Sequence, residues 1–107
     1  MTAANLAVSI AMNVNKHVLL LDCDLRKPDL HRIFGCGDVP GLNDYLAEHR
    51  NLATLIQRTN VERLSLLPGG PIRPNPSELM SSERMSAMLA EVKDRYQDRL
   101  IVLDSPP

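Results

Sequence analysis

Three apolar runs along the chain predict buried β-strands. They occupy residues 18–21 and 100–103, and residues 64–67, where Ser65 interrupts the run. A continuous apolar run of this length is typical of a parallel strand that helices cover on both faces. Strands that alternate with helical segments are joined by right-handed crossovers. The pattern therefore predicts an α/β fold built on a parallel sheet.

Segments with apolar residues at intervals of three or four lie around and between these runs, and they predict helices. Proline is tolerated at the first helical position, so Pro28 and Pro76 mark the starts of two helices. Asn75 is a good N-cap, and Glu78 stands where the acid of a capping box belongs. The predicted helices span residues 2–14, 29–34, 42–48, 52–57 and a single long helix from residue 76 to residues 96–98.

Carboxylates follow the first and the last predicted strand. Asp22 and Asp24 come at or just beyond the end of the first strand, and Asp104 ends the last one. In an open α/β sheet the ligand crevice lies outside the carboxyl ends of the strands. Positions 22 and 24 share one side of an extended chain, so both carboxylates face the same ligand. Magnesium favours one or two carboxylates with phosphate oxygens and water. We therefore predict a site for Mg²⁺ and phosphate with exposed strand-end carboxylates; the alternative is that one aspartate caps a following helix or turn.

Composition narrows the class of protein further. A chain of 107 residues forms one small domain or a piece of one. The formal net charge of −1 and the aromatic content of 3% give no support for a nucleic-acid-binding surface. The apolar runs fall short of the roughly 20 residues that span a bilayer. Cys23 and Cys36 are too far apart for a CxxC redox motif, and we interpret them as reduced thiols.

Two of the segments described above resemble motifs of one family. Residues 18–28, VLLLDCDLRKP, resemble the variant second Walker motif of bacterial tyrosine autokinases (BY-kinases). Residues 101–107, IVLDSPP, resemble their Walker B motif, and residues 67–85 resemble the linker and helix start between the two. The resemblance covers essentially the whole chain. It implies a three-layer, P-loop NTPase-like fold and a protein-tyrosine kinase of capsule and exopolysaccharide biosynthesis.

The resemblance also implies roles for particular residues. Asp22 is expected to be the catalytic carboxylate near the acceptor hydroxyl and the metal. Asp24 is expected to help hold Mg²⁺, and Asp104 to hold it through water, with ATP as the substrate. Arg26 contacts phosphate or fixes Asp24, and a surface ion pair remains an equal alternative. Lys27 is expected to be solvated.

Partners and location follow from the same resemblance. The phosphate acceptor is expected to be a tyrosine-containing protein or the kinase's own tyrosine-rich tail. A membrane activator of polysaccharide export is an expected partner, as is a second copy of the full-length kinase. Nucleic acid is not expected as a partner. The expected location is cytoplasmic, at the inner membrane through a partner or a further segment.

The chain lacks one motif of this fold. No G-x-x-x-x-G-K-[ST] loop, which normally holds the phosphates of the nucleotide, occurs in residues 1–107. We therefore expect residues 1–107 to be a partial nucleotide-binding domain, incomplete at both ends and inactive alone. Two alternatives remain open: a positioning ATPase of the MinD/ParA kind, and a non-catalytic module that pairs with an intact kinase or its membrane activator.

Overall fold

A four-stranded sheet organises the computed structural model, which describes residues 2–106. Strand β1 pairs in parallel with β3 and with β4, so the three predicted strands and their parallel pairing are confirmed. The short strand β2 is antiparallel to β3. It lies at the end of the segment predicted to be helical, because the chain turns back through a hairpin in which the Thr59 hydroxyl donates to the Leu64 carbonyl (2.8 Å). The strand order is β2-β3-β1-β4, with bounds β1 Val18–Asp22, β2 Gln57–Arg58, β3 Leu64–Leu67 and β4 Leu100–Asp104.

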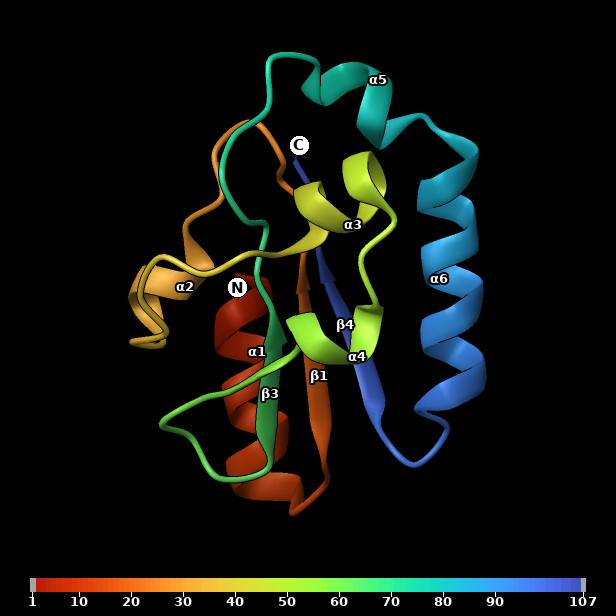
Figure 1. Cartoon of the computed structure of the whole chain (residues 1–107). Helices are drawn as coiled ribbons and strands as arrows, with labels where there is room; N and C mark the ends of the chain where they lie inside the picture. The colour runs from red at the N-terminus through yellow and green to blue at the C-terminus, as the bar shows by residue number, and fades with distance from the viewer. Residues whose placement is uncertain (1, 107) are drawn as a thin grey trace.

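Helices cover both faces of the sheet, and this gives the three layers that were predicted (Figure 1). Leu19 and Leu21 of β1 pack in one core cluster with residues of α3 (Leu42–Glu48), α4 (Leu52–Leu55) and α6 (Glu83–Arg95). Val18 and Leu20 point to the opposite face and pack with residues of α1 (Ala3–Ser9) and α2 (Leu30–Ile33). Every residue of β1 is buried because this strand lies between β3 and β4. The alternation of a β-strand thus supplies apolar side chains to two separate cores.

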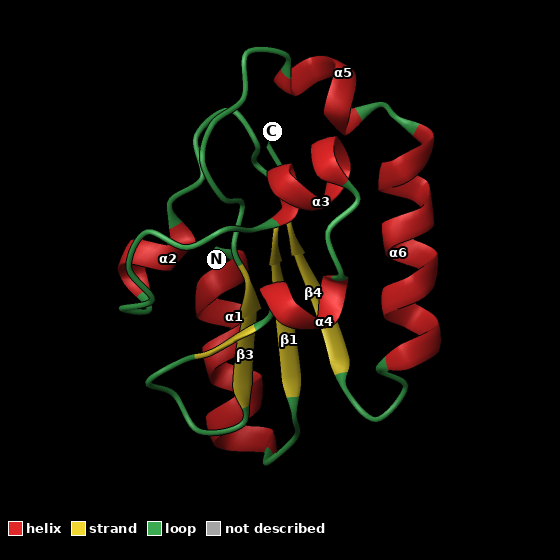
Figure 2. Ribbon diagram, viewed as in Figure 1, coloured by secondary structure: helices red, strands yellow, loops and turns green. Residues whose placement is uncertain are grey.

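Most predicted helices form, with changed boundaries. The first predicted helix becomes α1 followed by a wider π-helical turn, η1, which ends at Asn15 in a left-handed conformation (φ 59°). The helix after Pro28 begins one residue later than predicted, and the one that follows residue 51 ends at Leu55. The bounds are α1 Ala3–Ser9, η1 Ile10–Val14, α2 Leu30–Ile33, α3 Leu42–Glu48, α4 Leu52–Leu55, α5 Pro76–Met80 and α6 Glu83–Arg95 (Figure 2).

The prediction of one long helix after residue 76 is wrong. The chain forms α5, leaves the helical path at two serines and starts again as α6. The Ser81 hydroxyl donates to the Ser77 carbonyl (3.0 Å), and the Ser82 hydroxyl accepts the amide of Met85 (3.3 Å). Serine side chains compete with helical hydrogen bonds in this way and favour caps. The N-cap that was predicted at Asn75 makes no side-chain hydrogen bond.

Strand β4 differs from the buried strand that was predicted. It lies at the edge of the described sheet, and Leu100 and Leu103 are 40% and 44% exposed. An apolar run does not distinguish a central strand from an edge strand, so the sequence alone predicted that β4 is buried on both faces. Across residues 2–106, none of the helices has the length and apolar character that crossing a membrane requires.

Candidate carboxylate site

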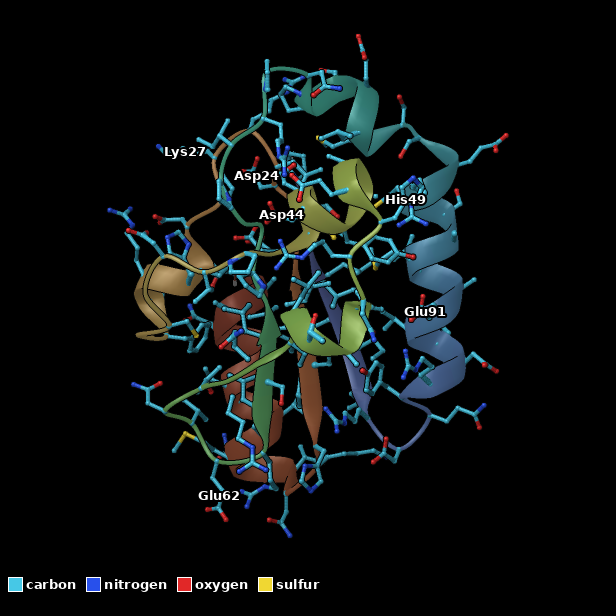
Figure 3. The ribbon with its side chains drawn as sticks, in the orientation of Figure 1. Asp24, Lys27, Asp44, His49, Glu62 and Glu91 are labelled. Carbon is cyan, nitrogen blue, oxygen red and sulfur yellow. The ribbon has the colours of Figure 1, made fainter. Side chains whose placement is uncertain are left out.

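The carboxyl ends of β1 and β4 lie side by side. Asp22 and Asp104 are register partners across the parallel pair, and the amide of Cys23 donates to the Asp104 carbonyl (3.0 Å). The backbone pairing therefore continues to the last residue of both strands. Asp24 follows one residue after Cys23, at the same end of the molecule (Figure 3). The structure thus brings the three candidate carboxylates to one edge of the sheet.

The Asp22 side chain is buried, contrary to the expectation of an exposed strand-end carboxylate. Its relative exposure is 1%. One carboxylate oxygen, Oδ1, accepts the amide of Asp24 (3.2 Å), and Oδ2 accepts the amides of Asp29 (3.1 Å) and Leu30 (3.3 Å). Asp22 therefore holds the 24–30 loop and the first amides of α2, which is the capping alternative left open by the sequence. The chain folds back over the strand end after Asp24, and this fold-back causes the burial.

Burial and mutual repulsion shift the acid–base properties of this edge. Burial raises the pKa of Asp22 above its usual value, the three amide contacts oppose this rise, and the nearby charge of Asp104 adds to it. The pKa of Asp104 is also raised, first by burial and then by the charge of Asp24. Carboxylates that repel one another in this way are stabilised in their charged form by a cation.

Asp24 and Asp104 have the chemistry that Mg²⁺ requires. Both are partly exposed, and neither side chain accepts a hydrogen bond or forms an ion pair within residues 2–106. In the same part of the chain, no group of three or more His, Cys, Asp or Glu side chains is arranged to hold a metal ion. Magnesium needs only one or two carboxylates when phosphate and water complete its shell. The two carboxylates fit such an ion, and the assignment of Asp22, Asp24 and Asp104 as ligands stays a prediction.

Arg26 contacts a neighbouring helix instead of a carboxylate. Its Nη2 donates to the Ser77 hydroxyl in the first turn of α5. Within the described residues it forms no ion pair, so neither the contact with Asp24 nor the surface ion pair considered above is present. Lys27 is exposed and extends from the surface of the loop (Figure 3). A side-chain hydrogen bond thus joins the 24–28 loop to α5.

Sequence reasoning missed the contribution of the loop over residues 68–73. The Pro68 and Gly69 carbonyls accept the amides of Leu42 and Asn43 at the start of α3 (both 2.8 Å). A side chain on Gly69 would come within 2.5 Å of the Pro28 Cβ, so the loop lies directly against the 24–30 loop. The Gly69-Gly70 pair was the signal for this close approach, because glycine permits it.

A buried acid fixes the same loop from α3. Asp44 accepts the amide of Gly41 through Oδ2 (2.7 Å) and forms an ion pair with Arg73 through Oδ1 (2.8 Å). Arg73 also pairs with Glu48 (2.6 Å). No role was predicted for Asp44 or Arg73, because residues 29 positions apart reveal no pairing without the fold.

A mainly apolar hollow of about 560 Å³ lies beside the site. Pro28, which belongs to the loop that Asp22 holds, forms part of its wall. His31 of α2 lines it together with Asp38, and the two side chains lie 3.7 Å apart. The other lining residues are Val39, Pro40, Arg50, Gly70, Pro71 and Ile72. The hollow therefore offers space for a ligand next to the carboxylate edge.

Comparison with known proteins shows which proteins this chain resembles. No family model matches the chain. The chain is 41% identical over 104 residues to the tyrosine-protein kinase Wzc of Salmonella typhi, covering 97% of the chain and 14% of that protein. It is 41% identical over 106 residues to the tyrosine-protein kinase YwqD of Bacillus subtilis, covering 99% of the chain and 44% of that protein. The chain thus spans less than half the length of both relatives.

Solved structures agree with the sequence relatives. The kinase domain of the Escherichia coli tyrosine kinase Etk superposes with a TM-score of 0.84 at 35% identity, over 98% of this chain and 40% of that one. The septum site-determining protein MinD of Pyrococcus horikoshii, solved with Mg-ADP, gives 0.77 at 28% identity over 97% of this chain and 42% of that one. The P-loop NTPase-like fold is confirmed, and the higher identities are with the kinases. The chain is therefore similar in sequence and fold to bacterial tyrosine-protein kinases, and it matches one segment of the solved Etk kinase domain.

Proposed function

We propose that residues 1–107 form the carboxylate-bearing part of a nucleotide-binding domain whose whole protein is a protein-tyrosine kinase. The reaction transfers the γ-phosphoryl group of ATP to a tyrosine hydroxyl. The pairing of Asp22 with Asp104 at the carboxyl edge, in a chain 41% identical to named tyrosine kinases, is the observation that carries this proposal. The process served is polysaccharide polymerisation or export, by the family resemblance.

Phosphoryl transfer depends mostly on positioning and on stabilisation of charge. Bound Mg²⁺ would neutralise developing charge on the phosphate oxygens. Asp24 and Asp104 would hold this ion, because their carboxylates are partly exposed and have no protein partner among residues 2–106. Asp22 belongs to the proposed catalytic set by the family resemblance, and its amide contacts position the loop that carries Asp24. Arg26, in the same loop, would contact a phosphate oxygen.

A chimera provides the decisive test. Residues 1–107 would replace the matching 106 residues of Bacillus subtilis YwqD, and phosphotyrosine would be measured with ATP and Mg²⁺. The expected result is phosphotyrosine formation that falls by about 10²-fold or more in Asp24→Asn and Asp104→Asn chimeras. Lys27→Ala is the matched control, because this side chain is exposed and should leave most activity intact.

The competing functions predict other outcomes for the same chimera. A positioning ATPase would release inorganic phosphate without forming phosphotyrosine. A non-catalytic module would bind an intact kinase or a membrane activator, and the chimera would be inactive although folded. A folded chimera whose phosphotyrosine level does not depend on Asp24 or Asp104 would contradict the assigned site. Self-association, a membrane activator as partner and a place at the cytoplasmic side of the inner membrane belong to the same proposal.

A further inference from the structure

Basic side chains precede all three parallel strands. His17, Arg63 and Arg99 come immediately before β1, β3 and β4. Val18 is the register partner of both Leu64 and Leu100, so the three basic residues stand at the same level of the sheet. Two backbone hydrogen bonds join them: the Val18 amide donates to the Arg63 carbonyl (2.8 Å), and the Leu100 amide donates to the His17 carbonyl (3.0 Å). The amino edge of the sheet is therefore basic, whereas its carboxyl edge is acidic.

A hollow of about 660 Å³ lies at this amino edge, and all three residues line it. Arg58 of β2 also lines it and is the register partner of Ser65, another lining residue. Glu62 is the single acidic residue of the lining. Figure 3 shows Glu62 at one end of the molecule and Asp24 at the opposite end. The hollow thus carries an excess of positive charge in a chain whose formal net charge is −1.

Several donors in the hollow are available to a ligand. Within the described residues 2–106, no hydrogen bond or ion pair engages the side chains of Asn15, His17, Arg58 and Ser65. Arg99 lies over the ring of Tyr96 (5.0 Å to the centroid) and 3.7 Å from Asp98, and its buried Nε has no hydrogen-bond partner in the described part of the chain. Buried polar atoms without partners are uncommon in proteins. These donors therefore have unused capacity for an anion.

The backbone around the hollow is held in place. Arg63 adopts a left-handed conformation (φ 68°), which is uncommon for a residue other than glycine. Its Nε and Nη2 both donate to the Ala11 carbonyl at the end of η1 (2.9 and 2.7 Å), and this bidentate contact fixes the turn. Asn15, on the same wall, is also left-handed (φ 59°). Unusual conformations of this kind cluster at ligand sites, because the surrounding structure determines them.

We propose that this hollow binds the phosphate group of a larger molecule, with Arg58 and Arg99 as its main cationic contacts and His17 and Ser65 as further donors. Arginine presents a planar fork that matches phosphate oxygens. These side chains offer more hydrogen-bond donors than the two oxygens of a carboxylate can accept. The volume of the hollow also exceeds that of a phosphate group alone. The site is separate from the carboxylate edge and goes beyond the proposed phosphoryl transfer. Its ligand is a free phosphate ester or a phospholipid headgroup.

Amide chemical shifts of the ¹⁵N-labelled chain would test the proposal. Inorganic phosphate and vesicles containing phosphatidylglycerol would be the two probes, with sodium chloride keeping the ionic strength constant. Signals of the lining residues should shift with at least one probe, and those of Asp24 and Asp104 should not. Shifts with phosphate identify a soluble ester as the source, and shifts with vesicles alone identify a headgroup. Either result supports the site.

Two variants and a matched control make the test specific. Arg58→Ala and Ser65→Ala remove one donor each, and Arg58→Ala should weaken binding about tenfold or more, as expected for a lost charge-assisted hydrogen bond. Arg95→Ala changes the net charge equally but removes an arginine that pairs with Glu91 on α6. The proposal fails if Arg95→Ala weakens binding as much as Arg58→Ala, or if neither probe shifts the lining signals.

Discussion

Asp22 and Asp104 are register partners on neighbouring parallel strands, yet only Asp22 is sealed from solvent. Asp22 accepts three backbone amides, whereas the Asp104 side chain accepts none within the described residues. Two carboxylates at equivalent positions therefore have different tasks. Asp22 holds the loop that follows β1, and Asp104 is available to a ligand. This difference leads to distinct effects of the same substitution at the two positions.

Asp22→Asn should destabilise the chain by about 1–3 kcal/mol, the scale for leaving buried hydrogen-bonding groups unsatisfied. An asparagine presents one acceptor oxygen and one NH₂ group, so its NH₂ group must face at least one of the three amides. Denaturant unfolding would measure the loss, and hydrogen exchange at Asp29 and Leu30 should become faster. The loss is expected because Asp22 is buried, whereas the sequence predicted an exposed strand-end carboxylate.

Asp104→Asn is the matched control for this loss. It alters the same residue type at the paired strand position, where the side chain has no amide partner in the described chain. Its free energy of unfolding near neutral pH should not fall. Equal destabilisation by the two substitutions would show that the amide contacts of Asp22 do not stabilise the fold.

The stability of the chain should depend on pH through Asp104. Its pKa in the folded chain is raised above the usual 3.8, so the folded state holds the proton more tightly than the unfolded state. The contribution of this carboxyl to stability is therefore complete below about pH 3.8 and is lost as pH rises through the folded pKa. The unfolding free energy of Asp104→Asn minus that of the unsubstituted chain should be near zero in acid and grow with pH. A difference that stays constant across pH would contradict the raised pKa.

Much of the scaffold was predictable, because its strongest signals are local. The strands β1 and β4 contain continuous apolar runs, β3 contains one interrupted only by Ser65, and helical spacing identified most of the helices. β2 was missed because two residues carry no periodicity. The long helix was predicted across Ser81 and Ser82 because each serine alone is compatible with a helix. The break arises from hydrogen bonds that both serines form with neighbouring backbone groups.

The carboxylate site was predictable in position but not in detail. The sequence of an aspartate that follows a strand does not reveal whether the next residues extend into solvent or fold back over the aspartate side chain. Asp22 is buried because the amides of residues seven and eight positions later return to it. The pairing of Asp44 with Arg73 depends in the same way on a contact between distant segments. Residue type thus identified the edge of the sheet, and tertiary contacts decided which carboxylates are free.

Cys23 should be far less reactive than Cys36. Burial, and to a lesser extent the charges of Asp22 and Asp104, raises the pKa of Cys23 to about 12. The thiolate is the reactive form, so little of it exists at pH 8. Burial also raises the pKa of Cys36, but this side chain is partly exposed. Iodoacetamide followed by mass spectrometry should show Cys36 labelled first in the native chain, and a Cys36→Ser variant should label slowly until denaturant is added. Equal labelling rates would contradict the burial of Cys23.

Arg73→Ala should loosen the 68–73 loop. The change removes the ion pair with the buried carboxylate of Asp44. A buried group that loses its partner lowers the free energy of unfolding by about 1–3 kcal/mol. Hydrogen exchange at the amides of Leu42 and Asn43, which donate to this loop, should become faster. Arg95→Ala is the control, since its ion pair with Glu91 lies on the surface of α6 and should contribute little. Unchanged exchange in Arg73→Ala would show that the backbone bonds alone hold the loop.

The chain of residues 1–107 should bind ATP·Mg²⁺ more weakly than micromolar. The G-x-x-x-x-G-K-[ST] loop normally supplies the backbone amides and the lysine that hold the phosphates, and residues 1–107 contain no such motif. Without this loop, ATP would attach mainly through Mg²⁺ held by Asp24 and Asp104. Two carboxylates hold Mg²⁺ weakly when no protein contacts to the phosphates assist them. Isothermal titration would measure the affinity, and any remaining heat should disappear in Asp24→Asn and Asp104→Asn but persist in Lys27→Ala. Micromolar affinity in the unsubstituted chain would show that other residues hold the phosphates, and equal loss in Lys27→Ala would place binding away from the carboxylate edge.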